Sequence, residues 1–218
     1  MPDEQLARDV SDELQWDPKV DSRAVTVFAA AGVVTLRGTV GSLWERREAR
    51  QAAQRVRGVI AVDNQLKVRF LNDERRADAD LRGDVLEVLM LDLRVPTSVD
   101  VKVKDGVVTL IGPVSWWYQR EEAESVAGNV PGVVDVRNEI FLDREAGPLS
   151  PADVEKKIRM AFLRNAQLDA DAIHVATADR MVTLSGTVRS WDEHDAALAA
   201  TWAAPGVQVV DDRIEVRS

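Results

Sequence analysis

Aromatic and basic side chains gather at the start of a predicted helix at residues 42–57, and they are the residues best suited to binding. Leu43 and Trp44 are followed closely by Arg46, Arg47 and Arg50. Tryptophan favours membrane interfaces, and apolar residues beside arginines are what a helix needs to bind anionic lipid. These five residues are therefore predicted to bind an anionic phospholipid surface. The alternative is that the aromatic residues pack against neighbouring units of the chain and that the arginines pair with nearby glutamates.

Two later helices carry aromatic residues at the same position. They are Trp116, Trp117, Tyr118 and Trp191. Several carboxylates follow them along the chain, and anionic lipid would repel these charges. A protein interface therefore fits these residues better than a membrane does. We expect them to bind a protein partner or a second copy of the chain, with simple packing between units as the alternative.

The sequence contains no constellation of residues that would perform catalysis. There is no cysteine, which excludes a thiolate nucleophile and a thiolate metal site. The two histidines, His174 and His194, are expected to be exposed, without a catalytic or metal-binding role. No phosphate-binding loop or nucleophile elbow occurs. We therefore expect no enzyme, no catalytic residue, no metal site and no cofactor. Potassium held by loop carboxylates such as Asp63 and Asp211 is a minor alternative.

The charge of the chain is acidic and unevenly distributed. The net charge is −9, with +1 in residues 1–71, −7 in residues 72–147 and −3 in residues 148–218. Nucleic-acid binding needs basic patches, so we expect no nucleic-acid partner. No apolar run approaches the roughly 20 residues of a membrane span, and the first residues do not resemble a secretory signal. We expect a cytoplasmic protein that can associate peripherally with a membrane.

The chain repeats one unit three times. VTLRGTV at 34–40, VTLIGPV at 108–114 and VTLSGTV at 182–188 begin 74 residues apart. Glycines recur in step with this period, and we expect them to have structural roles: Gly38, Gly112, Gly186, Gly58, Gly132 and Gly206. A period of this length indicates duplication of a whole domain. The predicted domains are residues 1–71, 72–147 and 148–218.

Each unit has the same predicted order of elements, α-β-β-α-β. An amphipathic helix opens it, as Leu6, Val10 and Leu14 indicate by their spacing. Two strands joined by a tight turn follow, then a helix, then a closing strand. Glycine within a strand weakens it, so we expect Gly38 to mark close approach of the crossing helix or a bulge. The fold class is α+β, with three small three-stranded sheets and two helices packed on one face of each.

The repeated pattern is specific enough to resemble a known family. Each unit carries V-T-L-x-G-x-V, then a helix, then Gly-Val, then a strand with Asn or Asp. The last parts are Gly58-Val59 with Asn64, Gly132-Val133 with Asn138, and Gly206-Val207 with Asp212. The chain resembles the BON domain, the bacterial osmotically induced and nodulation module, three times over. That resemblance implies the α-β-β-α-β fold and a binding module rather than an enzyme.

The resemblance also implies two classes of function. BON domains are viewed as modules that often bind phospholipid membranes, and some accompany protein assemblies or a potassium-binding protein. We expect a stress-associated module that binds anionic phospholipid through its first domain. The alternative is a cytoplasmic adaptor or scaffold for proteins, or a potassium sensor.

Overall fold

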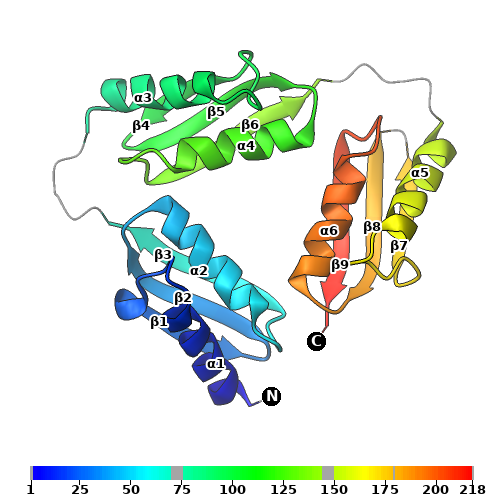
Figure 1. The fold of residues 1–218 in the computed structure, drawn as a ribbon, viewed down its shortest axis with the longest axis horizontal. Coiled ribbons are helices and arrows are strands. Elements are labelled where there is room, and N and C mark those ends of the chain that lie inside the picture. Colours follow the sequence, from blue (N-terminus) through cyan, green and yellow to red (C-terminus); the bar gives the residue numbers. More distant parts are fainter. Residues whose placement is uncertain (1, 70–75, 144–149, 179, 218) are drawn as a thin grey trace.

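A computed structural model describes residues 2–69, 76–143, 150–178 and 180–217. The predicted order of elements occurs in each of the three units (Figure 1). The first domain contains α1 (Asp3–Trp16), β1 (Val25–Ala30), β2 (Val33–Val40), α2 (Leu43–Arg55) and β3 (Ala61–Val68). The second contains α3 (Asp78–Leu91), β4 (Asp100–Lys104), β5 (Val107–Val114), α4 (Trp117–Gly128) and β6 (Asp135–Leu142). The third contains α5 (Pro151–Arg164), β7 (Ile173–Ala178), β8 (Met181–Val188), α6 (Trp191–Trp202) and β9 (Val209–Val216). Residues 70–75 and 144–149, which connect the domains, lie outside the described residues.

Each sheet has three strands, with the glycine-containing strand in the centre. The hairpin β1–β2 is antiparallel, and its turn at Ala31 and Gly32 has positive φ values of 49° and 80°. The third strand pairs parallel to the central one, which requires a crossover, and α2 supplies it. The same pairing recurs in the other two domains. The predicted α+β class with three small sheets is confirmed.

The core of each domain lies between the sheet and its two helices. In the first domain Leu6, Val10 and Leu14 of α1 are buried against Val34 and Leu36 of β2. The face of α2 that meets them is made of alanines, which lets the helix lie close to the strands. Equivalent clusters form in the other two domains. The helical spacing noted in the sequence therefore identifies the buried faces of all three opening helices.

The central-strand glycines have a different cause from the one expected. Gly38, Gly112 and Gly186 have φ values of +132°, +131° and +132°. A Cβ atom at Gly38 would overlap the backbone carbonyl oxygen of Ala24, just before β1. The close neighbour is therefore the start of the adjacent strand, so the prediction of a crossing helix is wrong. Gly58, Gly132 and Gly206 follow the second helices and also have positive φ values, as helix-ending glycines do.

The second helices of the three domains face one another at the centre of the molecule, and the first helices lie on the outside (Figure 1). Helix α2 packs against both α4 and α6. The three domains thus form one assembly around their crossover helices. No helix among the described residues is long and apolar enough to cross a membrane.

Candidate functional site

The starts of the second helices are held in place by local caps. Ser42 accepts a hydrogen bond from the Glu45 backbone N–H, as an N-cap serine does. The Glu45 carboxylate in turn accepts hydrogen bonds from the N–H groups of Gly41, at 2.7 Å, and Asp21, at 2.6 Å. Glu193 makes the same contacts with Arg189 and Asp169 in the third domain. These caps also tie the loop before the first strand to the helix, so the residues at the helix starts have fixed positions.

Two of these helix starts meet the end of a helix in the next domain. Leu43, the first residue of α2, is buried, belongs to the hydrophobic cluster of the second domain and lies against Gly128 at the end of α4. Trp117, the first residue of α4, stacks on Trp202 at the end of α6, with ring centroids 3.8 Å apart and planes 5° from parallel. Gly128 and Trp202 are 74 residues apart, as are Leu43 and Trp117. The two contacts are therefore the same contact repeated at equivalent positions, and we call them the domain junctions.

The residues predicted to bind lipid lie at the first junction. Arg46 reaches Asp135 of the second domain at 3.6 Å, and Arg47 is close enough to Glu122 to oppose the rise in pKa that burial causes in that carboxyl. Arg50 and Trp44 remain exposed. A hollow of about 310 Å³ between the domains is lined by all three arginines together with Glu124 and Asp135. In this arrangement Leu43 and Arg46 contact the second domain, while Trp44 and Arg50 line hollows at the junction and remain exposed.

The residues predicted to bind a partner separate into two groups. Trp117 forms the stack on Trp202, and Arg120 lies over its ring at 4.6 Å. Trp191 is half-buried and packs edge-on against His194, at 5.0 Å between centroids. Trp116 and Tyr118 are 39% and 52% exposed. Only these last two offer aromatic surface to a further molecule.

His194 is buried, so the expectation that it is an exposed histidine is wrong. Its Nε2 lies 2.8 Å from Asp212 of β9 and its Nδ1 lies 3.0 Å from the neighbouring Asp195. Hydrogen bonding to Asp195 and Asp212 raises the pKa of the His194 imidazole, against the opposing effect of burial. The recurring Asn or Asp of the closing strand could have predicted this contact, because Asn64 and Asn138 also bind the crossover helix, at the backbone carbonyls of Arg46 and Arg120. His174 is exposed, as expected.

The carboxylates considered for a cation do not converge. Asp135 pairs with Arg46 and Asp211 pairs with Arg213, while Asp63 accepts a hydrogen bond from Gln65. Within the described parts of the chain, no three His, Asp or Glu side chains gather closely enough to hold a metal ion. Potassium binding therefore stays an expectation that no described contact supports.

The outer face of α5 is a basic surface that the sequence analysis did not single out. Helix α5 carries four basic and two acidic side chains, whereas α1 has five acidic against one basic and α3 has four acidic against one basic. Lys156, Arg159, Met160 and Leu163 lie along one face of α5 and, together with Ala152 and Glu155, line a shallow hollow of about 340 Å³. Met160 is 46% exposed and Leu163 is 65% exposed. Comparing the charges of the three opening helices would have found this surface.

Comparison with known proteins places the chain in a family. The BON domain matches residues 2–69, 77–142 and 150–218. The chain is 32% identical over 145 residues to the osmotically-inducible protein Y of Escherichia coli (strain K12), across 64% of this chain and 72% of that protein.

Two solved structures of CdsD, a structural protein of the type III secretion system of Chlamydia trachomatis, also align with the chain. One covers 96% of this chain and 91% of its own, at 13% identity and a TM-score of 0.27. The other, of the C-terminal domain, covers 100% of both chains, at 13% identity and a TM-score of 0.28. Alignments at these scores support no structural argument. On the family match and the thrice-repeated unit, the chain belongs to the BON domain family and consists of three BON domains in tandem.

Proposed function

We propose that this protein is a non-enzymatic, stress-associated binding module that docks on anionic phospholipid surfaces through the outer face of α5. The name of its relative ties that protein to osmotic induction, which supports a role under stress. The observation that carries the lipid proposal is the face formed by Lys156, Arg159, Met160 and Leu163.

This face has the two properties that binding at a membrane surface requires. Its basic residues are attracted to anionic headgroups, at about 1 kcal/mol per Lys or Arg near the surface. Its exposed Met160 and Leu163 side chains can enter the boundary between headgroups and acyl chains. The face also lies on the outside of the molecule, away from the junctions of the three domains (Figure 1), so a flat bilayer can reach it.

Helix α2 offers a competing surface. Trp44 and Arg50 are exposed, and Arg47 lies beside them. Leu43 is buried against the second domain and Arg46 faces Asp135, so the number of groups left for lipid is smaller than the sequence suggests. A variant of the α2 residues is therefore compared with the α5 variant in the vesicle experiment described below.

The test is co-sedimentation with vesicles of pure phosphatidylcholine and with vesicles that also contain phosphatidylglycerol, at low and moderate salt. We expect binding only to the anionic vesicles, weakened by salt because exposed charges are screened. Lys156→Glu with Arg159→Glu should weaken this binding by about 30-fold or more, as two lost attractions of about 1 kcal/mol each imply.

Two matched variants locate the surface. Lys102→Glu with Lys104→Glu makes the same change in net charge on the exposed side of β4 and should bind nearly as well as wild type. If Trp44→Ala with Arg47→Glu abolishes binding while the α5 variant binds normally, the surface is α2 and the α5 assignment is wrong. Equal binding to neutral and anionic vesicles would contradict the lipid proposal itself.

The exposed aromatic residues at the start of α4 favour a second function, an adaptor that binds a protein partner or itself. Trp116 and Tyr118 are exposed, and at the other junction Trp44 lines a hollow of about 510 Å³ beside Val130 and Pro131. Sedimentation velocity of wild type and of Tyr118→Ala over a range of concentrations tests self-association. A concentration-independent monomer in both would count against it.

A further inference from the structure

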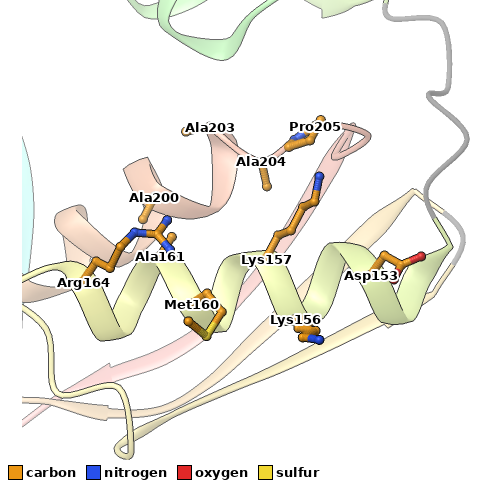
Figure 2. Close-up of a pocket in the computed structure, with 10 residues that line it drawn as sticks. All are labelled: Asp153, Lys156, Lys157, Met160, Ala161, Arg164, Ala200, Ala203, Ala204 and Pro205. Atoms are coloured by element: carbon orange, nitrogen blue, oxygen red, sulfur yellow. The ribbon is translucent and has the colours of Figure 1, made fainter.

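The two helices of the third domain enclose a groove that has an apolar floor. It measures about 680 Å³ and is lined by Ala161 of α5 and by Ala200, Ala203, Ala204 and Pro205 in and after α6 (Figure 2). That volume is within the range of small-molecule sites, about 300–1,000 Å³. The floor consists of methyl groups and a proline ring, so it offers apolar contact.

The first domain closes the same place with an ion pair. The residues equivalent to Ala161 and Ala203 lie 148 positions earlier and are Glu13 and Arg55. The Arg55 guanidinium contacts the Glu13 carboxylate at 2.9 Å and the Asp17 carboxylate at 2.6 Å, and it thereby connects α2 to α1 across the groove. Both members of this pair are alanine in the third domain, so nothing equivalent crosses it there.

The second domain fills the same place with larger apolar side chains. Val88 of α3 takes the position of Ala161 and packs against the core cluster of that domain, and Val126 of α4 takes the position of Ala200 and does the same. A second ion pair, between the loop after the first helix and the second helix, is also missing from the third domain. The pairs Lys19–Glu48 and Arg94–Glu122 join the loop after the first helix to the second helix, whereas the third domain has Gln167 and Ala196 there. The third domain therefore lacks the ion pair of the first domain, the larger apolar side chains of the second domain and the loop-to-helix ion pair that both have.

The rim of the groove is cationic. Lys156, Lys157 and Arg164 line it, with Asp153 as the one carboxylate in the lining. Lys156 and Lys157 act on Asp153 electrostatically and lower the pKa of its carboxyl, after the larger effect of Ser150. Within the described residues, none of the three cations forms an ion pair. Figure 2 places Lys157 towards Ala204 and Pro205, and Arg164 beside Ala161 and Ala200 at the other end of the groove.

We infer that this groove binds a single-chain anionic amphiphile, of which a long-chain fatty acid is the simplest. The carboxylate pairs with Arg164, whose guanidinium can donate two parallel hydrogen bonds to it. The alkyl chain lies over Ala161, Ala200, Ala203 and Ala204 towards Pro205. Residues 157 and 164 are about 10 Å apart along the helix axis, so the chain runs beneath the aliphatic stem of Lys157.

An anionic amphiphile would contact both the cationic rim and the apolar floor of the groove. An inorganic anion would use the cations and leave the alanine floor in water, while a neutral apolar ligand would leave the cations unused. The inference goes beyond docking on a bilayer, because the ligand is a single molecule held between α5 and α6, although the groove shares Lys156 and Met160 with the outer face of α5.

The test is isothermal titration calorimetry with laurate, below its micelle concentration. We expect 1:1 binding to wild type and at least about tenfold weaker binding of octanoate, because each buried methylene contributes about a fourfold factor in affinity. Dodecyltrimethylammonium, which has the same chain with a cationic head, should not bind.

The decisive variant is Ala161→Glu with Ala203→Arg, which installs the ion pair of the first domain without changing the net charge. It should reduce laurate affinity at least tenfold. Arg164→Gln should reduce laurate affinity about tenfold, because it removes the guanidinium that pairs with the laurate carboxylate. If the closing variant does not fold, as judged by circular dichroism, Ala200→Leu fills the floor instead. Unchanged laurate binding in the folded closing variant, or equal binding of dodecyltrimethylammonium, overturns the inference.

Different variants test the vesicle-docking proposal and the groove proposal, so one can fail while the other holds. The closing variant keeps Arg159, Met160 and Leu163 and should still sediment with anionic vesicles. Arg159→Glu with Leu163→Ala changes two residues of the outer face that do not line the groove, so it should weaken vesicle binding and keep most of its laurate affinity. Loss of laurate binding in the vesicle-defective variant alone, with the closing variant unaffected, contradicts the groove assignment.

Discussion

At the scale of single residues, the contact between the closing strand and the crossover helix varies among the three domains. Asn64 and Asn138 donate from Nδ2 to the backbone carbonyls of Arg46 and Arg120. In the third domain the strand residue is Asp212, which has no N–H group to donate, and His194 stands where the other domains have arginine. The His194 ring at 2.8 Å replaces the missing donor. The helix is thus held by a group whose charge changes near neutral pH.

We predict that the stability of the third domain depends on His194 and pH. The pKa of His194 in the folded protein is raised above its ordinary value of 6.5, chiefly by Asp195 and then by Asp212. The folded state therefore binds the proton more tightly than the unfolded state does. This stabilisation is fully present below about pH 6.5 and is lost as the pH rises through the higher folded value. Urea denaturation between pH 5.5 and 8.5 should show it.

The variant His194→Gln should flatten this part of the pH profile, because glutamine keeps a hydrogen bond to Asp212 and cannot be protonated. His174→Gln is the control, since His174 is exposed, and its profile should follow wild type. A wild-type slope retained in His194→Gln would assign the dependence to another group.

At the scale of elements, each hairpin is built around a glycine of the central strand. Gly112 in β5 pairs within the sheet, yet its φ is +131° and a Cβ atom would meet the backbone carbonyl of Ser98. The obstacle is backbone, which cannot move aside as a flexible side chain does. The strand can therefore pass the start of β4 only if this position has no side chain. The repeat preserves the glycine because the same obstacle occurs in each hairpin.

We predict that Gly112→Ala lowers the free energy of unfolding of the second domain by more than about 2 kcal/mol, since it combines a strained φ with a backbone overlap. Gly83→Ala is the matched control in the same domain. Gly83 lies in α3 with no atom within 4 Å of an added Cβ, so alanine should stabilise the helix by about 0.5–1 kcal/mol. Urea denaturation of both variants checks the pair, and a loss of similar size in each would contradict this account of Gly112.

At the scale of the whole molecule, the domains are joined by contacts that recur with the repeat. The start of one crossover helix meets the end of the next, through Leu43 on Gly128 and Trp117 on Trp202. Head-to-tail contacts of this kind form closed rings when the rotation between units allows it. Helices α2 and α6 also pack together, so the third side of the arrangement is occupied as well. Leu43 and Trp117, each the first residue of its helix, therefore serve the assembly of the three domains.

We predict that Trp117→Ala loosens the third domain from the second without unfolding either. A stacked aromatic pair contributes about 0.5–1.5 kcal/mol beyond its buried area. Small-angle X-ray scattering should give a larger radius of gyration than wild type, while circular dichroism stays unchanged. Trp16→Ala, at a side chain that is 84% exposed, should leave both measurements unaltered. Equal radii for wild type and Trp117→Ala would mean that other contacts hold the domains together.

Local signals account for what the sequence could predict. The spacing of Leu6, Val10 and Leu14 depends on neighbours within a few residues, and the period of the repeat depends on exact recurrence. They predicted the element order and the buried helix faces of all three domains. The reason for Gly38 could not be predicted, because it depends on which segment comes to lie beside the strand.

The surfaces of the molecule were decided by tertiary structure. Leu43 and Trp117 have the sequence features of exposed binding residues, yet both pack at a domain junction, because burial depends on segments far apart in the chain. The groove between α5 and α6 is likewise invisible locally, since Ala161 and Ala203 are unremarkable until the fold sets them opposite each other. By itself the sequence determined three copies of one α-β-β-α-β domain and their hydrophobic cores. Only the tertiary structure decided which faces of those copies remain available to a ligand, because that depends on how the copies pack.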